Sequence, residues 1–135
     1  MASYSGNNSN NFSDYTGTES ISMYGYGGND SLFGSTNNDF LYGADDNDYL
    51  DGESGNDYLD GGNGNDTILG GVGSDTLYSG YGFDLLSGGD GDDYLYNGTS
   101  TALDTSSDYL MGGNGNDSII GGYGNDTLTG DVRFV

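Results

Sequence analysis

A single leucine or isoleucine recurs at a fixed interval through most of this 135-residue chain. The interval is nine residues, apart from one longer gap after Leu95. A short fixed period predicts a solenoid, in which each unit buries its apolar residue only when neighbouring units stack on it. The eleven positions are Leu32, Leu41, Leu50, Leu59, Ile68, Leu77, Leu86, Leu95, Leu110, Ile119 and Leu128.

Each of these residues is the next-to-last of a glycine-rich phrase and follows an aspartate by two positions. The most regular copies are GGNGNDTIL (61–69), GGVGSDTLY (70–78), GGNGNDSII (112–120) and GGYGNDTLT (121–129). The first six residues predict a turn, whose glycines permit positive φ and close backbone approach. The last three predict a strand with its middle residue pointing inward. A curled turn directs carbonyl oxygens inward and the aspartate adds a carboxylate, and such hard oxygen ligands suit calcium.

The phrase closely resembles the nonapeptide G-G-x-G-x-D-x-U-x of RTX (repeats-in-toxin) proteins, over about residues 25–131. The resemblance implies an all-β fold, a right-handed parallel β-roll (a β-solenoid) with two nonapeptides per coil. Eleven repeats then give about five coils. It also implies that calcium ions lie between stacked turns along both edges of the roll.

The resemblance assigns the metal ligands to the repeated aspartates and to backbone carbonyls of the turns, with roughly seven to ten calcium ions in all. The aspartates are Asp30, Asp39, Asp48, Asp57, Asp66, Asp75, Asp84, Asp93, Asp108, Asp117 and Asp126. The other candidate ligands are Gly25, Gly27, Gly52, Gly61, Asn63, Gly70, Val72, Gly88, Asp90, Gly112, Asn114, Gly121 and Tyr123. The stretched repeat at 97–111 lacks a glycine turn, and we expect its site to be altered even though Asp108 remains.

The charge balance makes the predicted roll dependent on its metal. The chain has 22 acidic residues and one basic residue, Arg133, for a net charge of −21. Aspartates stacked ~5 Å apart repel by about 1–3 kcal/mol per pair, and one Leu or Ile per repeat makes a thin core. We therefore expect the metal-free chain to be unfolded and calcium to supply the folding free energy. About nine ions would reduce the net charge to about −3.

Composition also excludes several classes of function. The acidity excludes nucleic acid as a partner and opposes contact with an anionic membrane. No apolar run approaches the 18 residues of a transmembrane helix. There is no Cys and no His, and the aspartates are accounted for by the calcium pattern, so we predict no catalytic residues, no organic cofactor and no enzymatic activity. Random acidity in a disordered or halophilic chain is the alternative explanation, but it does not place eleven aspartates in register.

The chain divides into three parts by pattern. Residues 1–24 form an Asn/Ser-rich N-terminal arm or a capping turn, with Met23 where an inward leucine would lie. Residues 25–129 are the eleven repeats, with an insertion within 97–107. Residues 130–135 form a C-terminal tail that resembles an uncleaved type I secretion signal, and the alternative for this tail is a strand that caps the roll. The resemblance implies a secreted protein, extracellular or at the cell surface.

The outward strand positions suggest a second surface. If alternate repeats lie on opposite sheets, one sheet carries six aromatic residues in five repeats and the other carries three in six. An exposed aromatic stripe of this size favours an interaction surface, although tyrosine is also common in strands for its β-propensity. The six are Phe40, Tyr42, Tyr58, Tyr78, Tyr94 and Tyr96.

The leading hypothesis is a secreted calcium-binding structural protein that folds on calcium and self-associates into filaments or a surface layer. Its partner would be another copy of itself, joined through open sheet edges. The alternatives are a small calcium-dependent adhesin with a cell-surface or polysaccharide contact, an ice-binding module, or the secretion and folding module of a larger exoprotein. Asparagine at the fifth position of most repeats is the feature that keeps ice binding open.

Overall fold

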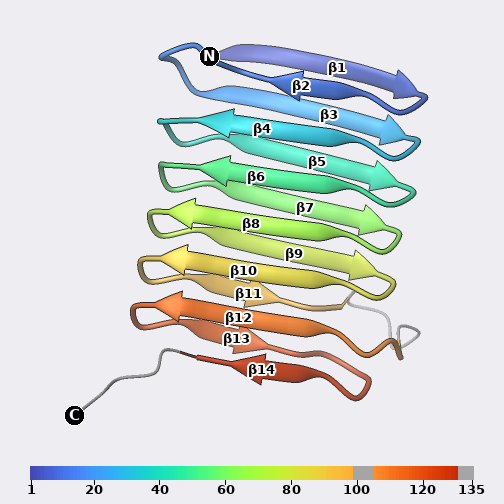
Figure 1. Cartoon of the computed structure of the whole chain (residues 1–135), viewed down its shortest axis with the longest axis vertical. Helices are drawn as coiled ribbons and strands as arrows, with labels where there is room; N and C mark the ends of the chain where they lie inside the picture. The colour runs from blue at the N-terminus through green and yellow to red at the C-terminus, as the bar shows by residue number, and fades with distance from the viewer. Residues whose placement is uncertain (99–104, 131–135) are drawn as a thin grey trace.

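The computed structural model describes residues 1–98 and 105–130, and these form a β-solenoid of stacked coils (Figure 1). Within the described residues there are strands and turns and no helix, and so no helix long and apolar enough to cross a membrane. The strands are β1 (Ala2–Asn8), β2 (Phe12–Asp14), β3 (Ile21–Gly27), β4 (Ser31–Ser35), β5 (Phe40–Asp45), β6 (Tyr49–Glu53), β7 (Tyr58–Asn63), β8 (Thr67–Val72), β9 (Thr76–Tyr81), β10 (Leu85–Asp90), β11 (Tyr94–Tyr96), β12 (Tyr109–Asn114), β13 (Ser118–Ile120) and β14 (Thr127–Thr129).

The odd-numbered and even-numbered strands form two separate parallel sheets of seven strands each, here called the odd sheet and the even sheet. Each strand pairs with the strand two places along the chain, so two nonapeptides make one coil. Leu41 lies opposite Leu59, and Leu59 opposite Leu77, each pair 18 residues apart. The all-β fold with two repeats per coil and alternate repeats on opposite sheets is therefore confirmed.

The core is a column of inward side chains held between the two sheets, one from most strands and two, Ile21 and Met23, from β3. In the described part of the chain eleven hydrophobic residues are buried, the last of them Leu110. Ile119 is partly buried against this column, and Leu128, in the last described strand, is 46% exposed. Each Leu or Ile therefore depends on the coil that follows it, as the nine-residue period predicted.

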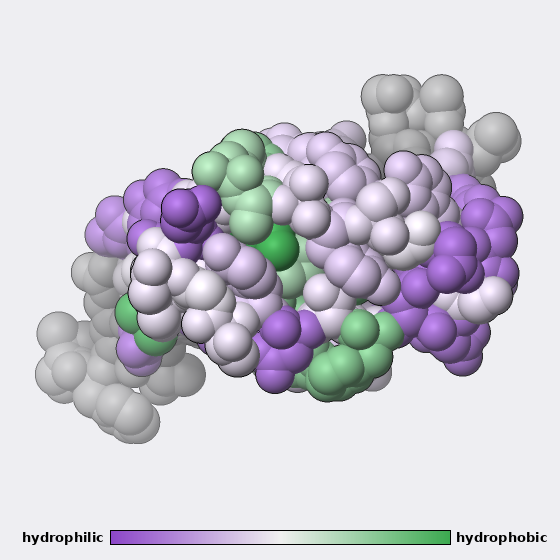
Figure 2. All heavy atoms as spheres, turned by 90° about the horizontal axis from the view of Figure 1, so that it is seen from above, coloured by the Kyte–Doolittle hydropathy of each residue, from purple (hydrophilic) through white to green (hydrophobic). Residues whose placement is uncertain are grey.

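The first 20 residues differ from the sequence-based expectation of an arm or a capping turn. They form β1 and β2, the first coil of the roll, and seven strands in each sheet replace the expected count of about five coils. Ala2 and Tyr4 face Ile21 and Met23 in register, and Tyr15 also packs on the core. This coil escaped prediction because Tyr4 and Ser13 occupy the inward positions that leucine occupies elsewhere. Figure 2 shows the roll from its N-terminal end, with hydrophobic residues in the middle and hydrophilic residues on either side.

The turns need glycine for two different reasons. Glycines at the second and fourth positions have positive φ, for example 103° at Gly62 and 142° at Gly64, a region that side chains disfavour. The first-position glycines show no positive φ and are needed for space instead, which corrects the expectation of positive φ there. Many strands also run into the following turn and reach six residues, where three had been predicted.

Candidate metal centres

The repeated aspartates form a hydrogen-bonded ladder along each edge of the roll. In each rung, Oδ1 of one aspartate accepts the main-chain N–H of the aspartate one coil earlier, as from Asp57 to Asp75 at 2.8 Å. Nine such bonds of 2.7–3.1 Å join the aspartates, within the edge that runs from Asp30 to Asp126 and the edge that runs from Asp39 to Asp117. The nine-residue period therefore places every one of these carboxylates at the inside of a turn.

The second oxygen of most of these carboxylates has no partner at all. A buried carboxylate oxygen without a hydrogen bond is costly, because it has lost water and gained nothing in return. Among the described residues, nine Oδ2 atoms are in this state. They belong to Asp30, Asp39, Asp48, Asp57, Asp66, Asp75, Asp84, Asp93 and Asp117.

Seven of these unpartnered oxygens lie beside a backbone carbonyl of the turn below, around the point where a side chain would begin on a first-position glycine. A Cβ built on Gly52 would lie 2.5 Å from Oδ2 of Asp57 and 2.6 Å from the carbonyl oxygen of Gly70, so glycine is required at this point of close approach. Oδ1 of Asp75 faces the same space through its bond to the N–H of Asp57. The donor set is therefore two carboxylates with backbone carbonyls, which fits a hard divalent cation such as calcium.

No space gathers three acidic or imidazole or thiol side chains within the described part of the chain. The remaining ligands must then come from the main chain. Six of the candidate first-position carbonyls lie beside the carboxylate or amide group of the preceding turn, those of Gly25, Gly52, Gly61, Gly70, Gly88 and Gly112. The carbonyls of Gly43 and Ser79 lie in the same way, although they were not singled out from the sequence.

The third-position candidates lie at the outer rim of the turns, where their strands end. The carbonyls of Val72, Asp90 and Asn114 each accept a main-chain N–H from the previous coil, at 2.7–2.8 Å. One lone pair of each of these oxygens is thus already used. Gly27 and Asn63 lie at the ends of β3 and β7, and the side chain of Tyr123 is 61% exposed.

Burial raises the pKa of six of the repeated aspartates above the ordinary value, those of Asp48, Asp57, Asp66, Asp75, Asp84 and Asp93. For Asp57, loss of hydration is the largest cause, and the neighbouring carboxylates of Asp75 and Asp39 raise the pKa further. The hydrogen bond from the Asp39 N–H opposes them, because it stabilises the charged form. The pKa is about 7 for Asp48, Asp57 and Asp84 and about 6 for Asp66 and Asp75.

Protein groups supply almost no positive charge to compensate these carboxylates. In the parts of the chain that the structure describes, the one ion pair joins the N-terminal amine to Glu19 at 3.5 Å, on the surface of the first coil. Arg133 lies outside the described residues. The described residues therefore do not supply the positive charge that would compensate these carboxylates.

Eight spaces between consecutive turns are enclosed by two repeated aspartates and contain an unpartnered Oδ2. Asp117 carries the ninth unpartnered oxygen at the end of its edge, beyond the last of these spaces. Four spaces lie on one edge, between Asp30 and Asp48, Asp48 and Asp66, Asp66 and Asp84, and Asp84 and Asp108. Four lie on the other, between Asp39 and Asp57, Asp57 and Asp75, Asp75 and Asp93, and Asp93 and Asp117.

Asp108, in the stretched repeat, departs from the hydrogen-bonding pattern of the other aspartates. Its Oδ2 accepts hydrogen bonds from the Asn97 amide at 2.6 Å and the Ser106 hydroxyl at 2.9 Å. Oδ1 of Asp108 still accepts the N–H of Asp84 and belongs to the space above it. Sequence reasoning missed Asn97, because a change of the first-position glycine alone does not show where the new side chain points.

Comparison with known families agrees with this geometry. A family model described as the RTX calcium-binding nonapeptide repeat matches the chain in four copies, at residues 24–59, 42–77, 69–99 and 104–132. No curated protein and no solved structure matches the chain.

Proposed function

Because the chain belongs to the family of RTX calcium-binding nonapeptide repeat proteins, we propose that it is a calcium-dependent structural protein that folds on calcium and then associates with copies of itself. RTX nonapeptide repeats bind calcium. Proteins with these repeats are generally secreted. The further steps of the proposal are folding on calcium, an extracellular location for this chain, and assembly.

The unpartnered Oδ2 atoms are the observation that carries the proposal. A space such as that between Asp57 and Asp75 places two carboxylates and the Gly70 carbonyl together, with no protein donor for the free oxygen of Asp57. Calcium takes six to eight oxygen ligands in flexible geometry. These aspartates and carbonyls would hold it, and when bound it supplies positive charge to the space.

Calcium binding is coupled to folding in this proposal because the space exists only in the folded roll. Two aspartates one coil apart come together only when their strands have paired. The net charge of −21 opposes that pairing until cations neutralise it. Abundant extracellular calcium would then allow the chain to fold after export and not before.

Far-UV circular dichroism with and without calcium tests the folding step. We expect a coil spectrum in chelator, β structure in millimolar calcium, and reversal when chelator is added back. Magnesium at the same concentration is the control, because it demands near-octahedral geometry and keeps its water. Equal β content in chelator and in calcium would contradict the proposal.

Two features support self-association once the roll is neutral. The outermost strands are β1 and β13 in the odd sheet and β2 and β14 in the even sheet, and outer strands template the addition of further strands. Head-to-tail addition would place β13 beside β1 and β14 beside β2 of the next copy. Such a contact does not close and would produce a filament.

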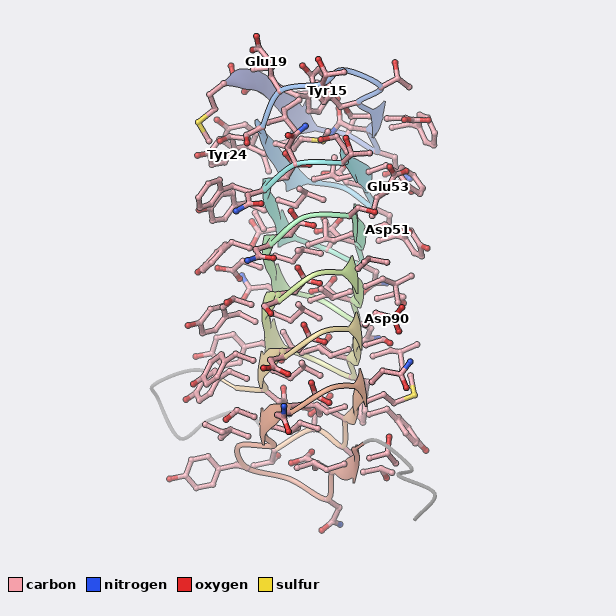
Figure 3. The ribbon with its side chains drawn as sticks, turned by 90° about the vertical axis from the view of Figure 1, so that its left-hand side faces the viewer. Tyr15, Glu19, Tyr24, Asp51, Glu53 and Asp90 are labelled. Carbon is pink, nitrogen blue, oxygen red and sulfur yellow. The ribbon has the colours of Figure 1, made fainter. Side chains whose placement is uncertain are left out.

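The odd sheet adds a ladder of aromatic rings along its outer face. Tyr24 stacks on Tyr42 with ring centroids 4.9 Å apart, and contacts continue from Tyr42 through Tyr58 to Tyr78 at 5.4–5.7 Å. Figure 3 shows Tyr24 projecting from one side of the roll, with the acidic side chains of Asp51, Glu53 and Asp90 on the other. A low-charge aromatic face on one side is the second surface through which copies would pack.

The asparagines of the outer turns, which were the sequence feature in favour of ice binding, form hydrogen bonds within the roll. Oδ1 of Asn29 accepts the N–H of Asn47, and Oδ1 of Asn47 accepts the N–H of Asn65. Bonds of the same kind run from Asn56 to Asn38 and from Ser74 to Asn56. These amides join successive turns by hydrogen bonds, so no observation favours ice binding as a second candidate function.

A further inference from the structure

The side chain of Asn97 lies between two turns, in the space that follows Asp108. Asn97 is 1% exposed, and its Nδ2 donates to Oδ2 of Asp108 at 2.6 Å and to the carbonyl of Gly121 at 2.9 Å. Its Oδ1 accepts from the hydroxyl of Ser79, one coil earlier. The amide thus contacts an aspartate Oδ2, the atom that has no hydrogen-bond partner in the regular spaces, and a first-position carbonyl of the kind that lies beside that atom there.

A second amide, that of Asn11, lies at the other end of the same edge, in the aspartate position of its coil. Asn11 follows Gly6 by five residues, as Asp30 follows Gly25, and its main-chain N–H donates to Oδ1 of Asp30 at 2.6 Å. Its Nδ2 lies 2.8 Å from the same oxygen, 2.6 Å from the carbonyl of Ser9 and 3.0 Å from that of Asn7. An amide therefore stands where each other coil of this edge has a carboxylate.

We propose that Asn11 and Asn97 close their two spaces without metal, so that the first coil and the stretched repeat are held by side-chain amides while the eight regular spaces are held by calcium. An amide NH₂ donates two hydrogen bonds and carries no charge. The Asn97 amide therefore gives Asp108 Oδ2 the donor that the regular spaces lack. The Asn11 amide places an uncharged donor between Asp30 Oδ1 and the carbonyl of Gly25, 3.4 Å away, where the other coils have a carboxylate. The inference rests on the proposed binding of calcium at the regular turns.

The regular spaces, which would each hold calcium, number eight. Eight enclosed spaces have an unpartnered Oδ2 on the aspartate above and a second aspartate below. The space between Asp108 and Asp126 has the Asn97 amide, and the space above Asp30 has the Asn11 amide. The third exception lies above Asp39, where Ile21 stands in the aspartate position and adds no carboxylate.

The functional consequence is a roll with a metal-free first coil. Repulsion between carboxylates does not oppose its pairing with the second coil on the Asn11 side, because only Asp30 carries charge in that space. In the stretched repeat, where the first-position glycine is replaced by Asn97, the Asn97 amide likewise joins Asp108 to the carbonyl of Gly121 in the next turn. Both places hold the chain in register for the calcium-dependent coils.

Isosteric substitution of the two amides tests this assignment. In Asn11→Asp and Asn97→Asp, an oxygen replaces the donor nitrogen and a second or third carboxylate enters the space. We expect each variant to bind one more calcium ion than the wild type, counted by native mass spectrometry across a calcium titration and checked by isothermal titration calorimetry. The double variant should bind two more.

Asn47→Asp is the matched control, because the side chain is exposed and its accepting Oδ1 is retained. It makes the same charge change and should leave the ion count unchanged. Circular dichroism in millimolar calcium establishes that each variant still forms the roll, and if one fails to fold the other decides. Unchanged counts in folded Asn11→Asp and Asn97→Asp, or a gain in Asn47→Asp as well, would overturn the inference. A wild-type protein that binds no calcium would instead overturn the proposed function.

Discussion

The main-chain N–H of Asp48 donates to Oδ1 of Asp66, one coil later, at 2.8 Å. Asp66 in turn leaves its Oδ2 unpartnered, facing the next turn on the same edge. One oxygen of Asp66 therefore holds the coil above in register, and the other creates the need for a cation below. Register and metal binding depend on the same carboxylate, so at neutral pH the loss of either is expected to weaken the other.

Asp66→Ala should weaken calcium-induced folding more than Asp117→Ala. Asp66 contributes to two enclosed spaces, the one shared with Asp48 and the one shared with Asp84. Asp117 contributes to the enclosed space shared with Asp93. Loss of a charged hydrogen-bond partner alone costs about 1.5–3 kcal/mol, equivalent to roughly tenfold or more in affinity. A calcium titration followed by circular dichroism gives the midpoints.

Asp51→Ala is the control for this comparison. Asp51 lies at an outward position of β6, where it accepts hydrogen bonds from the Tyr49 hydroxyl and the Glu53 N–H, and it is not one of the aspartates that enclose a space between turns. Its calcium midpoint should remain that of the wild type. If all three substitutions shift the midpoint equally, total charge and not the site determines folding.

Acid should partly replace calcium in folding the roll. The pKa of Asp48, Asp57 and Asp84 is about 7 in the folded chain, raised chiefly by burial from an ordinary value of 3.8. A raised pKa means that folding favours the protonated form, so the stabilising contribution is complete below about pH 4 and is lost as the pH rises toward 7. We therefore expect β structure in calcium-free buffer near pH 4.5 and coil at pH 7.5, measured by circular dichroism at low protein concentration.

In calcium the pH dependence should reverse. The metal binds the deprotonated carboxylates, so its affinity falls as they take up protons. The calcium midpoint should rise as the pH is lowered from 7.5 to 5.5.

For the acid-folding prediction, a metal-free chain that remains coil at every pH would show that carboxylate repulsion is not what prevents folding.

Ala44→Gly should stabilise the calcium-bound roll. Ala44 occupies a second turn position with φ of 91°, and a non-glycine residue in left-handed conformation costs about 1–2 kcal/mol. Gly62 holds the same position one coil later with φ of 103°. Gly62→Ala is thus the opposite change, and its Cβ would also meet the carbonyl of Ala44. Thermal unfolding in saturating calcium should show a higher Tm for the first variant and a lower one for the second.

The period of the sequence was sufficient to predict the regular coils, because Asp and Leu or Ile have the same task in every one of them. It was not sufficient where another residue performs that task. In the first coil Asn11 occupies the aspartate position and Tyr4 occupies the leucine position. The Asp and Leu pattern therefore does not identify the first coil. The five-residue step from Gly6 to Asn11 was the one available signal. The tail at 130–135, for which a secretion signal was predicted, lies largely outside the described residues.

Replacing Tyr94 and Tyr96 together by serine should weaken self-association in calcium while the roll itself still forms. Both rings contact Tyr78, at 6.2 and 5.8 Å, and lie on the outer face of the odd sheet. Their inward neighbour Leu95 is fully buried and is untouched by the change. Tyr109→Ser is the matched control, because Tyr109 is 58% exposed on the even sheet, away from the aromatic ladder. Sedimentation and electron microscopy should show smaller assemblies for the double variant and wild-type assemblies for the control, at equal calcium and equal β content. If the wild type remains monomeric at high concentration in calcium, assembly is refuted and the adhesin alternative becomes the stronger hypothesis.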